Sequence, residues 1–207
     1  MTPFQRLFSV LTKPWVAAAY WGLIVVSFFY FDIAIASYFH QFDLRNTMPV
    51  LNWLTNLGIG GIYLVGFFIL ALFFRYIYPN KRFENKAWFL WFCVVIPSVI
   101  CLFLKVILGR AGLYFDDHLY GFYWLQKNAS FWSFPSGHTT NIMGLTFALS
   151  IIFPKYGYYF IVTGFLVAFS RVLLTHHYVS DVLAAAYLAM LEVGIFYIWL
   201  QRKNWLI

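Results

Sequence analysis

The amino-acid sequence predicts an all-α membrane protein, folded as a bundle of six transmembrane helices. Its composition is the first reason for this fold class. Of the 207 residues, 63% are hydrophobic and only 10% are charged, whereas soluble domains carry about 25% charged residues. The mean hydropathy is +0.76. A chain with so little polar surface cannot cover a water-soluble globule, so a lipid bilayer has to surround much of it.

Six apolar stretches are the second reason, because a spanning helix needs about 20 predominantly apolar residues. They cover residues 15–38, 51–74, 87–108, 139–153, 158–174 and 182–200, and the fourth is the shortest. Residues 1–13 precede them, and a short interfacial helix on the cytoplasmic surface is expected there. The sequence contains no internal repeat and no long linker, which indicates one domain over residues 1–207.

The distribution of Lys and Arg predicts the orientation of the bundle. With a cytoplasmic N-terminus, nine of these residues fall in cytoplasmic segments and five in outer segments. Cytoplasmic loops of membrane proteins are enriched in Lys and Arg, so both termini are expected in the cytoplasm. The net charge of +7 is spread among apolar runs and forms no dense patch, which argues against nucleic acid as a partner.

The longest connection, residues 109–135, lies on the outer side in this orientation. It is rich in aromatic residues, which favour the headgroup level of a membrane. Two interpretations are open, an interfacial anchor or a wall of a lipid-headgroup site, and one loop can serve both. The aromatic residues are Tyr114, Phe115, Tyr120, Phe122, Tyr123, Trp124, Phe131, Trp132 and Phe134.

Polar side chains at membrane depth are costly, which makes them candidates for function. In the predicted topology, segments far apart in the sequence bring such side chains to the outer end of the bundle. We expect them to form one site. The candidates are Lys105, Arg110, Ser136, Gly137, His138, Ser170, Arg171, His176, His177 and Asp181.

These residue types suit phosphoryl transfer, which needs cations and amide donors around the phosphate oxygens. Lys105, Arg110 and Arg171 supply positive charge. Ser136 and Gly137 stand at the start of a predicted helix, where free N–H groups and the helix dipole favour an anion. These five residues are therefore the predicted phosphate-binding set.

Two histidines and a carboxylate complete the predicted chemistry. His177 and Asp181 are four residues apart and share a helix face, so the carboxylate can orient the imidazole for attack on phosphorus. His138 can protonate the departing alkoxide and then activate water. The same spacing would suit two metal ligands, but no third strong ligand is evident. We therefore predict neither a metal nor another cofactor.

Two motifs carry a resemblance to a known family. Phe134-Pro135-Ser136-Gly137-His138 resembles the PSGH motif of the type-2 phosphatidic acid phosphatase (PAP2) superfamily. Ser170-Arg171, five residues, His177, three residues and Asp181 are similar to its S-R-x5-H-x3-D motif. The resemblance implies that His177 is the nucleophile, Asp181 its partner and His138 the acid and base. It also implies phosphate binding by Arg171, Ser136 and Gly137, and it gives His176 no role.

The first family motif is altered. The usual form is K-x6-R-P, often within K-x3-G-R-x-R-P, and here Lys105, Gly109 and Arg110 match while Gly112 and Leu113 replace the final Arg-Pro. Either the Arg is substituted, or two residues are deleted and the loop takes another path. We expect Arg110 to take over the missing phosphate contact, in a weakened or retuned site.

The resemblance implies a membrane lipid phosphatase that forms a phosphohistidine. The expected partner is a phosphorylated lipid: phosphatidate, phosphatidylglycerol phosphate, undecaprenyl diphosphate or lipid A. The expected location is a bacterial inner membrane, with the site facing the periplasm. Two alternatives remain, a lipid phosphotransferase on the same fold and a catalytically impaired lipid-binding protein. The sequence does not determine the oligomeric state.

Overall fold

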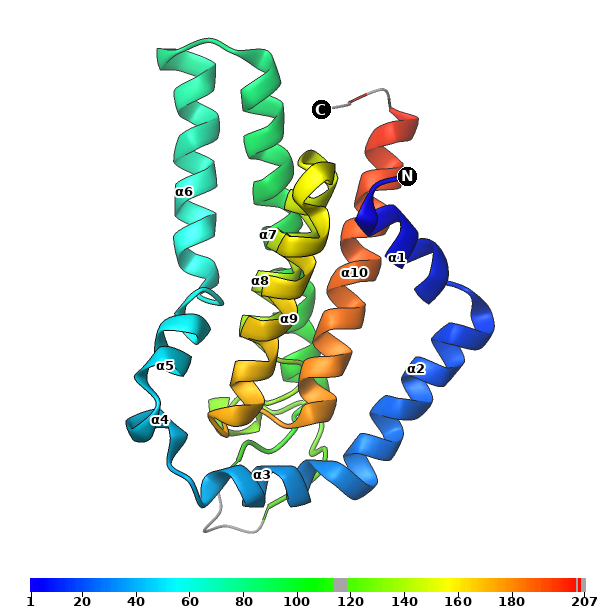
Figure 1. Cartoon of the computed structure of the whole chain (residues 1–207), viewed down its shortest axis with the longest axis vertical. Coiled ribbons are helices and arrows are strands. Elements are labelled where there is room, and N and C mark those ends of the chain that lie inside the picture. Colours follow the sequence, from blue (N-terminus) through cyan, green and yellow to red (C-terminus); the bar gives the residue numbers. More distant parts are fainter. Residues whose placement is uncertain (114–118, 204, 206–207) are drawn as a thin grey trace.

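The computed structural model describes residues 1–113, 119–203 and 205, and this part of the chain is built from helices (Figure 1). Its one β-like feature is an isolated bridge between Arg110 and Phe122. The helical segments, in order, are α1 (Pro3–Leu11), α2 (Pro14–Val26), η1 (Ser27–Phe31), α3 (Asp32–His40), α4 (Leu44–Thr47), α5 (Pro49–Asn56), α6 (Gly60–Leu72), η2 (Phe73–Ile77), α7 (Lys81–Leu108), η3 (Ala129–Phe131), α8 (Gly137–Ile152), η4 (Pro154–Tyr156), α9 (Gly157–Leu173) and α10 (Val179–Arg202).

Helix α8 is the centre of the bundle, in contact with α7, α9 and α10. Its side chains are buried almost all round, as expected for a helix that is apolar on every face. Gly144 lets α8 approach α7 closely, because an added Cβ would lie 2.3 Å from the backbone oxygen of Cys93. This close packing fixes the start of α8 at one end of the bundle.

The first predicted span is a continuous helical run, Pro14–His40, but it is not straight. A π-helical segment, η1, separates α2 from α3, and such insertions are a recognised cause of bends. Figure 1 shows α3 lying across the end of the bundle while α2 runs along it. The bend brings Asp32, the first residue of α3, to the end where α10 begins.

The second predicted span is interrupted between α5 and α6, at residues 57–59. The interruption is packed against the start of α8. A Cβ on Gly58 would lie 3.0 Å from the Cβ of His138, and one on Gly60 would lie 2.2 Å from the Asn141 side chain. Small residues at this break therefore make room for His138 and Asn141.

Within the described residues, five helical runs are long and apolar enough to cross a membrane: Pro14–His40, Pro49–Ile77, Lys81–Leu108, Pro154–Leu173 and Val179–Arg202. Helix α8 corresponds to the fourth predicted span but has 16 residues, fewer than a typical spanning helix needs. Five of the six predicted spans thus meet the length and composition expected, and the count of six stays a prediction.

The predicted N-terminal helix is present as α1. It starts at a capping box formed by Thr2 and Gln5. Phe4 is 1% exposed, its ring lies 5.3 Å from that of Phe147, and α1 also contacts α9 and α10. The helix is therefore docked onto the bundle by its apolar side.

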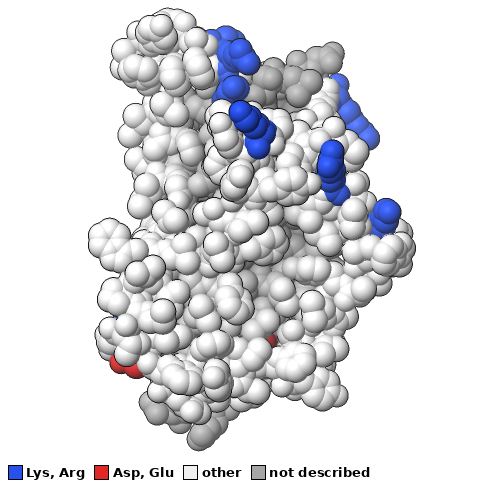
Figure 2. Space-filling model, in the orientation of Figure 1, with Lys and Arg blue, Asp and Glu red and all other residues white. Residues whose placement is uncertain are grey.

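Helix α1 and the end of α10 lie at the same end of the bundle, and α3 lies across the other end (Figure 1). Figure 2 shows Lys and Arg side chains gathered toward the end that carries the termini, above a largely uncharged surface. The α7–α8 and α9–α10 connections lie at the opposite end, with α3. The candidate site residues lie in these connections and in the helix ends that flank them, and are thus at the end of the bundle opposite to the basic residues that Figure 2 shows.

Candidate functional site

The turn between α9 and α10 presents two adjacent histidines. The backbone oxygen of Arg171 accepts hydrogen bonds from the amides of His176 at 2.9 Å and His177 at 3.3 Å. Thr175, just before them, has φ 52, a left-handed conformation that is uncommon for a β-branched residue and marks a tight turn. The turn therefore ties both imidazoles to the end of α9.

His177 faces Asp181, as the four-residue spacing predicts. Nδ1 of His177 lies 3.5 Å from Oδ2 of Asp181, which is long for a hydrogen bond. Oδ2 is also bound by Ser133 Oγ at 2.6 Å and the Tyr178 amide at 3.1 Å. The Asp181 side chain is 0% exposed and that of His177 is 11% exposed. The imidazole is therefore the accessible member of the pair, and the carboxylate is fixed behind it.

Burial lowers the pKa of His177 below its usual 6.5, and Asp181 opposes that shift. Burial costs the charged imidazolium its hydration, while a neighbouring carboxylate stabilises it. The net effect is a ring that is neutral, and therefore nucleophilic, at neutral pH.

The start of α8 is held against the start of α10. Ser136 caps α8, accepting from the Thr139 amide at 3.4 Å, and its own amide donates to the Asp181 backbone oxygen at 3.3 Å. The Ser136 hydroxyl is buried and committed to the cap. Both the hydroxyl and the amide of Ser136 are thus engaged within the protein. The predicted anion contacts of this helix start therefore fall to the amides of its first residues, Gly137 and His138.

Lys105 extends from α7 over the same helix start. A Cβ on Gly137 would lie 3.7 Å from the Lys105 Cε, so the lysine stem passes beside the first residue of α8. Its Nζ donates to the backbone oxygen of Trp132. Lys105 and Gly137, both predicted to bind phosphate, are therefore neighbours.

Arg171 is 7% exposed and its guanidinium is oriented by two side chains. Nη1 donates to Thr55 Oγ1 at 2.9 Å, and Nη2 lies 2.7 Å from Nδ1 of His176. Since a guanidinium only donates, this nitrogen of His176 accepts. Burial and the charges of Arg171, His177 and Arg45 lower the pKa of His176 to about 4, so the ring is neutral and suited to that role.

His138 lies at the start of α8, packed against Gly58 in the break of the second span. It is within electrostatic range of Arg171, His177 and Lys105. The structure thus gathers Lys105, Gly137, His138, Arg171, His177 and Asp181 at one end of the bundle, as the sequence predicts.

Arg110 is placed differently from the sequence expectation. Its side chain is 0% exposed. Nη1 donates to Asp181 Oδ1 and to Ser180 Oγ at 2.6 Å, and Nη2 donates to Asp32 Oδ2 at 2.7 Å. The guanidinium also lies over the rings of Phe28, Tyr120, Phe122 and Tyr178. Both terminal nitrogens bind carboxylates, because a charge removed from water needs counter-charges. Arg110 therefore contacts the back of Asp181 and is not positioned as a phosphate clamp.

A cavity of about 240 Å³ opens beside His177. Gly112 and Leu113, which replace the Arg-Pro of the family motif, are on its wall with Trp132 and Ser133. Position 112, where the family motif has an arginine, thus borders the candidate nucleophile His177. Here it is a glycine and has no side chain. Neither Arg110 nor Arg171 is among the residues that line this cavity.

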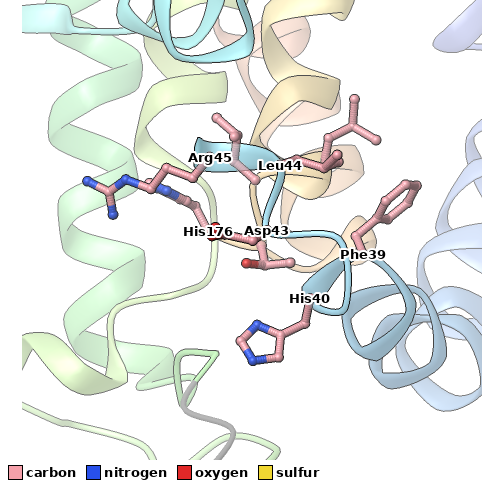
Figure 3. A pocket seen from close by; sticks show the side chains of 9 residues that line it. Phe39, His40, Asp43, Leu44, Arg45 and His176 are labelled. Atoms are coloured by element: carbon pink, nitrogen blue, oxygen red, sulfur yellow. The ribbon is translucent and has the colours of Figure 1, made fainter. Parts of the chain in front are cut away.

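A second cavity, of about 280 Å³, is also lined by His176 (Figure 3). Asp43, which precedes α4, and Arg45, in α4, line it together with Phe39 and His40 from the end of α3. Figure 3 shows these side chains around the opening. The α3–α4 segment therefore borders the site next to the α9–α10 turn.

The aromatic loop is partly packed into the protein. The rings of Tyr120 and Phe122 stack on Phe28, at 4.9 and 5.5 Å, whereas Trp124 is 59% exposed. This arrangement is compatible with both interpretations of the loop, a wall and an interfacial anchor. Tyr114 and Phe115 lie outside the described residues.

Sequence reasoning missed several side chains that support the site. Ser133 and Thr55 carry no sequence signal, because short hydroxyl side chains are common throughout membrane helices and loops. Asp32 did carry a sequence signal, since it is the acidic residue within an otherwise uncharged apolar stretch.

Within the described part of the chain, no group of three His, Cys, Asp or Glu side chains is arranged to hold a metal ion.

Comparisons with known proteins identify the family. The chain is 35% identical over 98 residues to the lipid A 1-phosphatase of Rhizobium johnstonii, a match that covers 46% of this chain and 40% of that protein. It is 35% identical over 65 residues to the undecaprenyl-diphosphatase of Bacillus subtilis, covering 31% of this chain and 34% of that protein. Each match thus spans less than half of the relative's length.

A solved structure, the PAP2-type phosphatidylglycerolphosphate phosphatase of Bacillus subtilis, aligns with 96% of this chain at 19% identity and a TM-score of 0.46. The model of the PAP2 superfamily matches residues 86–205. That segment is more than half of the chain and contains Lys105, His138, Arg171, His177 and Asp181. The chain therefore belongs to the PAP2 superfamily.

Proposed function

We propose that this protein is a membrane lipid phosphatase that removes phosphate through a phosphohistidine on His177. The observation that carries the proposal is the pairing of an accessible imidazole with a buried carboxylate, His177 with Asp181 at 3.5 Å. Lys105 is within electrostatic range of His177, and the helix start is joined to Asp181 through the Ser136 amide. A binding site for the phosphate anion, a nucleophile and a group that orients the nucleophile are the requirements of in-line phosphoryl transfer.

The mechanism follows from the positions of these groups. Nε2 of His177 attacks phosphorus as the bond to the lipid oxygen breaks, and positive charge develops on the ring. Asp181, on the Nδ1 side, stabilises that charge. His138 gives its proton to the leaving alkoxide and then takes one from water, which attacks the phosphohistidine and frees phosphate. Lys105, Arg171 and the α8 amides neutralise the phosphate oxygens.

The proposed substrate is a phosphomonoester or diphosphate of a membrane lipid. The relatives act, by their names, on lipid A, on undecaprenyl diphosphate and on phosphatidylglycerol phosphate, and these define the first panel to test. We further propose six membrane crossings, in which α8 is the fourth and the five longer helical runs are the others. Both termini would lie in the cytoplasm of a bacterial cell, with the site open to the periplasm. The basic end that carries the termini supports this orientation.

The test is phosphate release by the purified protein from that lipid panel in detergent, with His177→Ala beside it. The wild-type protein is expected to release phosphate from at least one lipid, and His177→Ala to lower kcat by more than about 1,000-fold, since a covalent nucleophile has no substitute. A matching melting temperature shows that the variant is folded. Equal phosphate release by the two proteins would refute the assignment of His177.

One observation keeps a second function under consideration. Gly112, on the cavity wall, stands where the family motif has an arginine, so the site lacks that positive charge. This absence favours a catalytically impaired lipid-binding protein. Binding of the panel lipids with no release of phosphate by the wild-type protein would support that function. A labelled phosphate that appears on an acceptor lipid, and not in water, would instead indicate a phosphotransferase.

A further inference from the structure

Asp32 is a buried carboxylate that the proposed mechanism does not use. It lies in the first predicted span, where residues 15–38 contain no other charged side chain. Its exposure is 1%, although an isolated carboxylate in an apolar interior is strongly unfavourable. Such a residue persists only with compensating partners, so its contacts indicate what it does.

The partners of Asp32 belong to the site. Oδ2 accepts from Arg110 Nη2 at 2.7 Å, and Oδ1 accepts from the backbone amide of Ser180 at 2.9 Å. Oδ2 also accepts from the Ser180 hydroxyl. Ser180 immediately precedes Asp181, and both lie in the first turn of α10. Asp32 thus holds the backbone next to Asp181 and, through Arg110, the Asp181 side chain.

This geometry assigns the two oxygens of Asp181 to different partners. Arg110 holds Oδ1, which leaves Oδ2 on the side of His177. Arg110 is itself shared between Asp181 and Asp32. Without the Asp32 charge, the guanidinium would pair with Asp181 alone and draw its charge away from His177.

The charge of the group leads to the same conclusion. Asp32, Arg110 and Asp181 are all 0–1% exposed and together carry one net negative charge. Attack by His177 places one positive charge on its ring, which this net negative charge balances in a medium of low dielectric constant. Neutralising Asp32 would leave the three residues with no net charge to stabilise that ring.

We propose that Asp32 is a positioning residue, which orients Asp181 toward His177 through Arg110 and Ser180. Neither Asp32 nor its partners Arg110 and Ser180 are among the residues that line the cavity beside His177, so Asp32 acts through Asp181 and not on the substrate. The inference rests on the proposed phosphatase activity. If Asp32 has this role, the bend of the first span and the start of α3 also affect the rate of phosphate release, because they position Asp32.

The test is the kinetics of Asp32→Asn and Asp32→Glu on the most active lipid of the panel. Asp32→Asn keeps the shape of the side chain and removes its charge. We expect kcat to fall about 10–100-fold, the loss typical when a residue that orients a functional group is replaced. KM should change less than about threefold. Asp32→Glu restores the charge and should recover part of the loss. Glu84→Gln, which removes a buried carboxylate at the start of α7, at the opposite end of the bundle, is the control and should leave kcat unchanged.

A double-mutant cycle separates positioning from a general loss of structure. In an Asp181→Asn background, Asp32→Asn should lower kcat by less than about threefold more, because its route to His177 is already cut. Full additivity of the two losses, or wild-type kcat in Asp32→Asn, would overturn the inference and leave the phosphatase assignment intact. No phosphate release by the wild-type protein would overturn both.

Discussion

At the scale of single residues, the cost of burying charge determines which side chains can meet a substrate. Arg110 and Arg171 both stand near the site, but Arg110 is surrounded by carboxylates, while Arg171 is held by a hydroxyl and an imidazole. A guanidinium bonded to neutral groups keeps its net charge for an incoming anion. This difference favours Arg171 for the proposed phosphate contact, whereas the contacts of Arg110 place it behind Asp181.

The pKa of His176 gives a prediction on stability. Because burial and nearby positive charges lower this pKa from 6.5 to about 4, the unfolded chain binds more protons than the folded protein between those values. The free energy of unfolding should therefore fall as the pH drops from about 6.5 to about 4. His177, whose pKa is also lowered, adds to the same trend.

Melting temperatures in detergent at pH 7 and pH 4.5 provide the measurement. The drop between the two pH values should be smaller in His176→Gln, because glutamine accepts from Arg171 but does not titrate. An equal drop in wild-type protein and variant would show that His176 is protonated alike in the folded and unfolded states.

At the scale of elements, two irregularities in the spans build the site. The π segment before Asp32 turns α3 across the bundle end, and the break at residues 57–59 makes space for His138. A straight pair of helices would carry Asp32 and Thr55 away from the arginines that they hold. Helix α8, fixed between α7, α9 and α10, provides the rigid part against which these irregular segments are placed.

The contact between α7 and α8 can be tested at Gly144. A Cβ there would lie 2.3 Å from the backbone oxygen of Cys93, and a backbone atom cannot move aside without shifting the helix. Gly144→Ala should therefore lower the unfolding free energy by about 1–3 kcal/mol. Calorimetry or a fluorescence melt of the purified protein would measure this change.

Gly66→Ala is the matched control, since a Cβ there meets nothing within 4 Å. Alanine favours a helix over glycine by about 1 kcal/mol, so this variant should melt at or above the wild-type temperature. A stable Gly144→Ala protein would mean that α7 and α8 are less tightly packed than the structure indicates.

At the scale of the whole molecule, charge and chemistry lie at opposite ends. On the face that Figure 2 shows, Lys and Arg side chains gather near the termini, while the candidate site is at the end where α10 begins. If the positive end is cytoplasmic, a substrate reaches the site from the outer leaflet.

Cysteine labelling in intact bacterial cells tests this orientation. Cys93 and Cys101 are buried, so an introduced cysteine reports its own side of the membrane. Lys127→Cys, in the loop near the site, should react with a membrane-impermeant maleimide, and Arg82→Cys, near the start of α7, should react only after the cells are opened. The reverse pattern would place the site in the cytoplasm.

Local sequence was sufficient for much of this protein. Apolar length predicts where helices run, because each span has to satisfy its own backbone in lipid. Motif spacing predicts that His177 and Asp181 share a face, and the cap at Ser136 follows from its position before an apolar run. These properties depend on residues a few positions apart, which is why sequence alone determined them.

Only the tertiary structure decided which charges neutralise one another. Arg110 pairs with Asp32, which is 78 residues away in the sequence, and Arg171 donates to Thr55, which is 116 residues away. These contacts depend on a bend in the first span and a break in the second, whose directions are set by packing against α8, α9 and α10. Propensity and spacing act over one or two turns of helix, whereas the pairing of buried charges is selected by the whole bundle.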